Sequence, residues 1–207
     1  KGIQITDAHL LNEIENVESL EFEPGSDYLY SNANPILLIK IIEHISKSSF
    51  KDYLQKNIFN PFELNNILLK KQYPYADRTL MAVPFNQDFQ EDAYEIAAKS
   101  LLFTATARDM ARWFEQLGDF KVSSKQSVKI LSEKAVIGDN IQAPLGLCDW
   151  ANDKIIEHSH HGSTANYECI VRRFKQDGIT IVILTNQKHG NVHEISDEIY
   201  KIIKKGS

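Results

Sequence analysis

The 207-residue sequence lacks several features that would place it in a specialised class of protein. It has only two cysteines, Cys148 and Cys169, which are too few for a disulfide framework and are interpreted as small buried residues. Lys40 and Glu43 interrupt its longest apolar run, so no segment reaches membrane-spanning length. The sequence contains no internal repeat, low-complexity tract or signal-peptide pattern, and the missing signal pattern leaves the compartment open.

Positive charge is also scarce. The chain has 23 Lys and Arg against 28 Asp and Glu, which gives a net charge of −5. Basic residues are adjacent only in pairs such as Arg172-Arg173 and Lys204-Lys205. Nucleic-acid binding depends on positive charge, so nucleic acid is excluded as the main partner. The composition, 43% hydrophobic and 25% charged, is that of a globular domain with a sizeable core.

The most informative stretch is FEPGSDYLYSNANP, which occupies residues 22–35. It predicts a Pro-Gly turn, a short aromatic run and a polar loop that opens a helix, with Asn34 as the N-cap and Pro35 as the first helical residue. The following segment, Ile36–Ile45, is mostly apolar, which predicts a deeply buried helix. Tyr30 and Asn32 would then stand on a rigid helix start and face one cleft. Taken alone, Y-x-N is a weak pattern, and an aromatic core residue beside a turn asparagine is its better interpretation.

Further helices are predicted by spacing and capping residues. Residues 1–20 contain one short helix, and Ser49 can cap a second that runs to about residue 58. Residues 65–99 indicate a connection with local structure, and a connection of this length is usually functional. Thr106 and Asp109 have capping-box spacing before a helix, so Asp109 is interpreted as a structural carboxylate. A helix over residues 124–133 follows.

The last third of the chain changes to the period of a strand. Residues 155–160 and 167–175 are predicted as strands, and Gln176-Asp177-Gly178 as a hairpin turn into a strand over 179–186. An amphipathic helix ends the chain, with His189 and His193 interpreted as surface residues near its start. Helices followed by an antiparallel hairpin and a packing helix predict an α+β fold.

Motifs in several of these segments resemble one known family. F-x-P-G-x-x-x-x-Y-S-N before an apolar helix, His160-His161-Gly162 on a strand, and the segment Leu101–Met110 are similar to the serine β-lactamase and penicillin-binding protein superfamily. The likeness is to its class C β-lactamase-like branch, which includes esterases and D-amino-acid peptidases. It implies a helical region beside an antiparallel sheet, with the site at their junction. The chain would be a single partial domain, with residues 1–135 mainly helical and 136–207 forming the C-terminal strands and helix.

The family's first motif, S-x-x-K with the nucleophilic serine, does not occur before Tyr30. One S-x-x-K occurs downstream, from Ser48 to Lys51, and is interpreted as a capping serine followed by a surface lysine. The resemblance therefore implies a domain incomplete at its N-terminus, whose missing segment is a partner of this chain. Its absence should uncover apolar surface on the helix Ile36–Ile45 and on the hairpin Tyr167–Asn186. The chain would then self-associate, rearrange locally or bind its own N-terminal portion.

The resemblance also assigns roles to individual residues. Tyr30 would be the base or proton relay, because nearby cations favour a phenolate. Asn32 would bind the S-x-x-K lysine and the substrate's amide. His160 stands where β-lactamases carry a lysine, and a histidine there makes the charge depend on pH. Gly162 would leave room for substrate along the strand, and the Ser163 N–H would be one oxyanion donor.

The function implied is hydrolysis of an amide or ester, in a β-lactam, a D-amino-acid peptide or an ester, through an acyl-serine. The alternative is a non-catalytic protein that recognises a cell-wall peptide or a protein partner. The family suggests a periplasmic or extracytoplasmic location. No cofactor is implied. The clustered His158, His160 and His161 could indicate a zinc site, but only His158 and His160 share one face of a strand. Two imidazoles are fewer ligands than zinc normally takes, so no metal is expected.

Overall fold

The computed structural model of the chain describes residues 7–69, 79–97, 101–132, 135–137, 140–142 and 144–206. Its helices are α1 (Asp7–Glu15), α2 (Ala33–Ser46), α3 (Phe50–Leu54), α4 (Tyr94–Ala97), α5 (Ala107–Gly118), α6 (Lys125–Ser132) and α7 (Val192–Lys205), and a π-helical turn, η1 (Gln55–Phe59), continues α3. The strands are β1 (Leu68–Leu69), β2 (Phe103–Thr104), β3 (Ala135–Ile137), β4 (Asn140–Gln142), β5 (Leu147–Ala151), β6 (Lys154–Ser163), β7 (Glu168–Phe174) and β8 (Ile179–Thr185). No helix in these ranges combines the length and apolar composition needed to cross a membrane.

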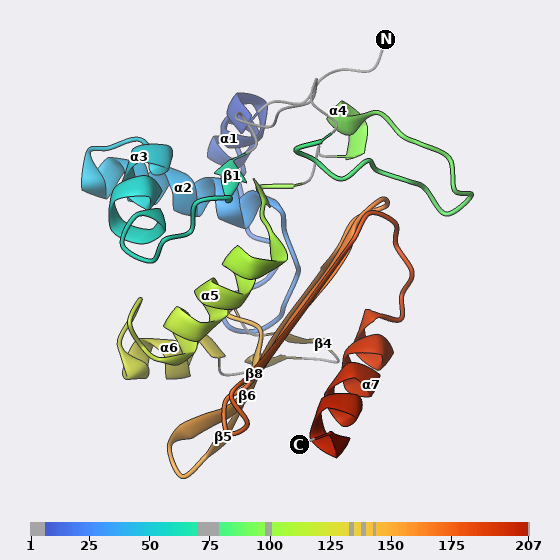
Figure 1. The fold of residues 1–207 in the computed structure, drawn as a ribbon. Coiled ribbons are helices and arrows are strands. Elements are labelled where there is room, and N and C mark those ends of the chain that lie inside the picture. The colour runs from blue at the N-terminus through green and yellow to red at the C-terminus, as the bar shows by residue number, and fades with distance from the viewer. Residues whose placement is uncertain are drawn as a thin grey trace.

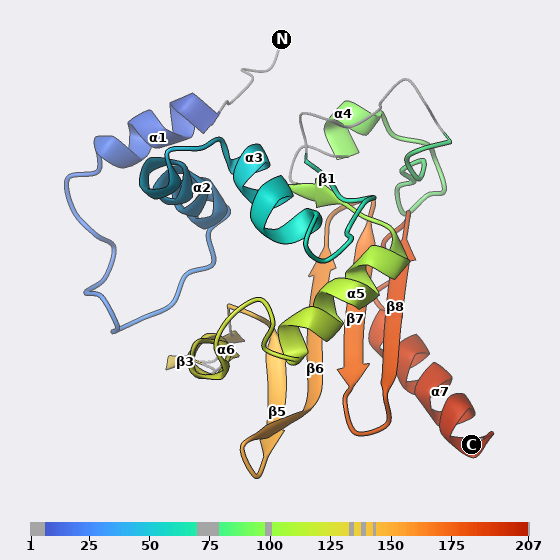
Figure 2. The ribbon, with the colours of Figure 1, turned by 60° about the vertical axis from the view of Figure 1, so that its left-hand side comes forward.

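A four-stranded antiparallel sheet in the order β5-β6-β7-β8 forms the centre of the fold (Figure 2). The predicted hairpin joins β7 to β8, and Gly178 in its turn has φ +69°, a conformation that glycine adopts without strain. Helix α5 lies on one face of the sheet and α7 on the other (Figures 1 and 2). Ile170, Val171 and Ile181 are buried between these layers. The α+β fold predicted from the sequence is therefore confirmed.

The start of α5 follows the predicted capping pattern. The Thr106 hydroxyl accepts a hydrogen bond from the Asp109 N–H at 3.2 Å. The Asp109 side chain is buried, and its Oδ2 accepts a hydrogen bond from the Asn66 N–H at 2.6 Å. Asp109 thus joins α5 to the segment after η1, and its predicted structural role is confirmed. Further along α5, Phe114 and Leu117 are buried. Phe114 stacks on His158 of β6, and Leu117 packs with Ile155 of β6 and Val128 of α6.

The start of α2 differs from the prediction. The helix begins at Ala33, with Asn32 as its N-cap residue and no side-chain cap at that position. The Ser31 hydroxyl accepts a hydrogen bond from the Ala33 N–H at 3.2 Å, so the chain already turns before Asn34. The assignment of Asn34 as N-cap and Pro35 as first helical residue is therefore wrong. Pro35 instead occupies the third helical position, where its missing N–H still costs no intrahelical hydrogen bond.

The prediction that α2 is deeply buried is also wrong for this chain. None of its residues is fully buried, and Leu38, Ile41 and Ile45 are 58%, 51% and 75% exposed. Among the described elements α2 packs mainly against α1 and α3, and all three lie apart from the large sheet (Figure 2). The apolar surface expected on this helix is thus present. On the β7–β8 hairpin, α5 and α7 cover most apolar side chains, and Leu184 is exposed.

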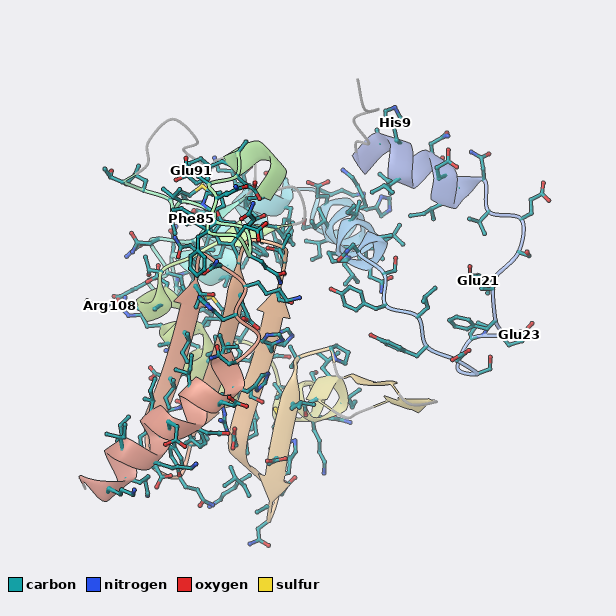
Figure 3. All side chains as sticks on the ribbon, turned by 90° about the vertical axis from the view of Figure 1, so that its right-hand side faces the viewer. His9, Glu21, Glu23, Phe85, Glu91 and Arg108 are labelled. Carbon is teal, nitrogen blue, oxygen red and sulfur yellow. The ribbon has the colours of Figure 1, made fainter. Side chains whose placement is uncertain are left out.

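Segment 79–97 crosses the end of the sheet at which β6 and β8 finish. The Phe85 N–H donates to the Asn186 carbonyl at 2.9 Å, and the Asn186 side chain donates to the Val83 carbonyl at 2.7 Å. A backbone bridge joins Phe85 to Glu91, and Figure 3 shows both residues above this end. The loop between α1 and α2, which carries Glu21 and Glu23, lies well away from it (Figure 3). Residues 70–78 of the predicted connection lie outside the described residues.

Candidate active site

Strand β6 brings His160, Gly162 and Ser163 together. It runs to Ser163 rather than ending at His160 as predicted, so the whole H-x-G motif lies in the sheet. Gly162 pairs with Cys169 of β7 and Ser163 with Glu168. Side chains alternate as expected for a strand. The His158 ring stacks on Phe114 of α5, whereas the His161 ring lies on the opposite face of the sheet and contacts His193 of α7.

The Y-x-N motif lies at the start of α2. Tyr30 is in the loop that precedes the helix, with 64% of its surface exposed, and Asn32 is the N-cap residue. Among the described residues, no hydrogen bond joins either of them to His160, Gly162 or Ser163. The candidate residues therefore form two groups, one at the start of α2 and one on β6. Their convergence on one cleft stays a prediction.

His160 lies against the turn that leads into β5. Gly146 in this turn has φ +83°, and a Cβ atom there would lie 2.7 Å from Cδ2 of His160. The imidazole is exposed overall, yet loss of solvation beside these protein atoms lowers its pKa, and the charge of His161 lowers it further. Neutral imidazole is thus the favoured form near neutral pH. His160 therefore cannot replace a permanently charged lysine.

His158 lies one pleat further along the same face and is fully buried. Its ring stacks on Phe114 with the ring centroids 4.6 Å apart, and its Nε2 lies 2.7 Å from the Leu145 carbonyl oxygen. The ring must carry its proton on Nε2 to donate this hydrogen bond. Burial lowers the pKa of His158, and the hydrogen bond to Leu145 offsets this effect only in part. His158 is therefore a neutral core residue that contacts the turn beside His160.

On the other face of β6, His161 meets a buried carboxylate. Nε2 of His161 lies 3.0 Å from Oε1 of Glu168, and Oε2 accepts hydrogen bonds from the N–H groups of His189 at 2.9 Å and Gly190 at 2.7 Å. Burial acts to raise the pKa of Glu168, but these N–H groups and the His161 ring outweigh it and hold the pKa below its usual value. Glu168 thus ties the end of β6 to the turn between β8 and α7.

An open pocket of about 450 Å³ lies beside Ser163. Its lining comes from three parts of the chain: the β6–β7 turn, the β8–α7 turn and segment 79–97. The lining residues are Asn86, Gln87, Asp88, Ser163, Thr164, Ala165 and Lys188. Side-chain bonds fix its walls, because Gln187 donates to the Asn86 carbonyl at 2.8 Å and Asn166 donates to Asp92 at 2.6 Å. The pocket thus lies at the end of β6.

Neither cysteine offers a nucleophile. Both are free thiols and half-buried. Burial raises the pKa of Cys148 to about 11 and also raises that of Cys169, so both stay protonated at neutral pH. Ser49 caps α3 as predicted, by accepting a hydrogen bond from the Asp52 N–H at 3.1 Å. The interpretation of Ser48 as a capping serine is therefore wrong.

Sequence reasoning missed Gly146 and Glu168. A signal existed for Glu168, because a carboxylate at the start of the apolar run Cys169–Val171 needs a partner when the strand is buried. No signal existed for Gly146. Its importance depends on the pairing of β5 with β6, which brings residues far apart in the sequence into contact.

A model of the β-lactamase family matches residues 11–203. The chain belongs to the β-lactamase family. The match covers both groups of candidate residues. The family includes serine hydrolases.

Three relatives of this β-lactamase family chain are informative. It is 36% identical to a D-aminopeptidase of Gluconobacter oxydans over 140 residues, and this alignment covers 64% of this chain and 26% of the relative. A penicillin-binding protein from Bacillus halodurans has a TM-score of 0.69 at 17% identity, over 89% of this chain and 59% of that one. A D-amino acid amidase from Ochrobactrum anthropi SV3, complexed with D-phenylalanine, has a TM-score of 0.73 at 15% identity, over 98% and 65%. The chain thus spans about a quarter of the first relative and under two thirds of the two solved chains.

Within the described residues, no three His, Cys, Asp or Glu side chains lie close enough together to hold a metal ion. The described histidines of β6 are instead divided between the two faces of the sheet, with His158 on the α5 side and His161 on the α7 side.

Proposed function

We propose that this β-lactamase family chain is the C-terminal part of a serine hydrolase that cleaves an amide bond of a D-amino-acid derivative or short peptide. The observation that carries the proposal is the H-x-G-Ser end of β6, which opens on a pocket within a chain that matches the family over residues 11–203. The reaction proceeds through an acyl-serine, and the attacking serine belongs to a part of the protein outside these 207 residues.

Each candidate residue has one task in this proposal. Tyr30 takes the proton from the attacking serine and returns it to the leaving group, as a general base and then a general acid. Asn32 binds the lysine of the S-x-x-K motif and the substrate's amide. The Ser163 N–H stabilises the oxyanion. Tyr30 lies on an exposed loop beside α2, so the segment that holds the serine must also bring this loop toward β6.

Gly162 fits the role of leaving room for substrate. A Cβ atom at this position would lie 3.4 Å from Sγ of Cys169, which is close to an ordinary van der Waals contact. Packing within the sheet therefore does not by itself require glycine. Close approach of a substrate backbone to the strand supplies a reason for it.

His160 supports an amino-acid amide or peptide as the substrate rather than a β-lactam. A lysine at this position would supply a permanent positive charge for an anionic substrate, whereas His160 is favoured in its neutral form. Two relatives point in the same direction, since one is a D-aminopeptidase and another a D-amino acid amidase complexed with D-phenylalanine. We therefore propose a D-amino-acid amide or a peptide with a D-residue before the scissile bond.

The test uses the intact protein. Hydrolysis of D-alanine p-nitroanilide, its L-enantiomer and a chromogenic cephalosporin is measured side by side, and the acyl-enzyme is sought by mass spectrometry. We expect the D-substrate to be hydrolysed faster than its L-enantiomer and the cephalosporin. Tyr30→Phe should lower kcat about a hundredfold or more, the size typical of a lost general base. The matched control is Tyr53→Phe in α3, which should keep full turnover. Equal kcat in the parent and the Tyr30→Phe variant would reject the role of Tyr30.

The second candidate is a protein that binds a cell-wall peptide or a protein partner without cleaving it. The 207 residues themselves do not distinguish it from the hydrolase, because no S-x-x-K stands before Tyr30 within them. The coding sequence upstream of Lys1 separates the two functions. An S-x-x-K motif there supports the hydrolase, and its absence, together with peptide binding without turnover, supports the binding protein.

A further inference from the structure

The turn before β5 approaches His160 more closely than any residue with a side chain would allow. A Cβ atom on Gly146 would lie 2.3 Å from the Ser159 carbonyl oxygen and 2.7 Å from Cδ2 of His160. Cβ atoms in proteins do not come this close to backbone atoms. Gly146 also has φ +83°, which a residue with a side chain adopts only with strain. Glycine is thus required here by space and by conformation together.

His158 holds the same turn in place. It reaches the Leu145 carbonyl oxygen with Nε2 at 2.7 Å, and the Leu145 N–H donates to the Leu131 carbonyl at 3.0 Å at the end of α6. The His158 ring is fixed in turn by Phe114 of α5, on which it stacks. The residue before Gly146 is therefore anchored on both sides, by the sheet and by α6.

The polarity of His158 needs an explanation beyond packing. Its ring is fully buried, and among the described residues Nδ1 finds no hydrogen-bond partner. A buried polar atom without a partner destabilises a fold, so an apolar ring of the same size would be the better residue for stacking on Phe114. What the imidazole adds is the N–H that donates to Leu145.

We propose that His158 and Gly146 are positioning residues for His160. His158 fixes the Leu145–Gly146 turn, and Gly146 lets that turn form the wall against which the His160 ring rests. His160 then has one orientation relative to Gly162 and Ser163 before any substrate binds. The catalytic consequence rests on the proposed function, in which His160 contacts the substrate. The structural part does not, because it concerns only the orientation of His160.

The structural part is tested by NMR on the 207-residue chain. The Cδ2–Hδ2 signal of the His160 ring is assigned by its loss in His160→Gln. We expect this signal to move in His158→Phe, which keeps a ring against Phe114 but cannot donate to Leu145, and to return close to its parent position in His158→Gln, whose amide can donate. Gly146→Ala should move it directly. Gly178→Ala is the matched control, because Gly178 also has positive φ but a Cβ there would meet nothing within 4 Å.

The catalytic part is tested with the same variants of the intact protein. Gly146→Ala and His158→Phe should lower kcat by about tenfold or more through misplacement of His160, with KM changed less, and His158→Gln should recover most of the loss. A His160 signal that stays in place in folded Gly146→Ala would overturn the positioning role. Because the NMR readout needs no turnover, an intact protein that hydrolyses nothing would reject the proposed function and leave the positioning result intact.

Discussion

Removal of the Glu168 carboxylate is expected to destabilise the fold strongly, because three donors share it. Glu168→Ala leaves the N–H groups of His189 and Gly190 and the His161 ring without their acceptor. The side chain of Glu168 is only 3% exposed, so water cannot easily take the place of its carboxylate as the acceptor for the two N–H groups. The His161 side chain is 35% exposed, so its ring can form a hydrogen bond to water instead. Hydrogen bonds to a charged group contribute about 1.5–3 kcal/mol each, and they are not additive. We therefore expect the free energy of unfolding to fall by about 3–4 kcal/mol.

Urea unfolding at pH 7, followed by circular dichroism, measures this loss. Glu198→Ala is the control, because Glu198 also pairs with a cation, Lys201, but its side chain is 66% exposed. Exposed ion pairs are worth at most about 1 kcal/mol, so this variant should unfold close to the parent. If Glu168→Ala unfolds at the same urea concentration as Glu198→Ala, the hydrogen-bond geometry described for Glu168 does not govern stability.

Three further outcomes are expected. Burial holds the pKa of His158 below its usual value, so as pH falls through about 6.5 this imidazole is protonated in the unfolded state before it is protonated in the folded state. The free energy of unfolding should therefore fall below that pH, and it should fall less in His158→Phe than in the parent. Equal changes in the two proteins between about pH 8 and pH 5, measured by urea unfolding, would contradict this. The 207-residue chain alone should show no covalent labelling by a fluorescent penicillin in mass spectrometry, and labelling of any serine, Ser48 included, would refute the assignment of the nucleophile to another segment. The chain should self-associate in sedimentation experiments, and Ile41→Lys with Ile45→Lys should reduce association, whereas a monomeric parent would show that α2 is not adhesive.

The sequence predicted well those features that depend on neighbouring residues. The Thr106 cap of α5 was predicted because it needs only a hydroxyl three residues before Asp109. The Gly178 hairpin likewise depends on its own turn residues. The family motif on β6 was also found from its letters alone. Each of these signals depends only on residues close in the sequence, so it does not depend on how the rest of the chain folds.

Features that depend on distant partners were not predictable in the same way. The apolar run Ile36–Ile45 indicates a helix, but its burial depends on what lies against it, and here α1 and α3 cover only part. The contact of Gly146 with His160 follows from the register of β5 on β6, and a shift of one residue would abolish it. The relation of Tyr30 to His160 is of this kind too, which explains why the motif letters alone could not fix it.

The border of the large sheet has a practical consequence for handling the protein. β8 is the last strand in the order β5-β6-β7-β8, and its residues, ITIVILT, include no charge and no proline. Within the described residues its outer edge has no strand partner. Such an edge can accept a strand from any neighbouring molecule, and natural proteins usually protect it with a charge. Concentrated samples and refolding from denaturant should therefore favour fibrous aggregates. A lysine at the exposed position of Leu184 is the smallest change that would block this growth.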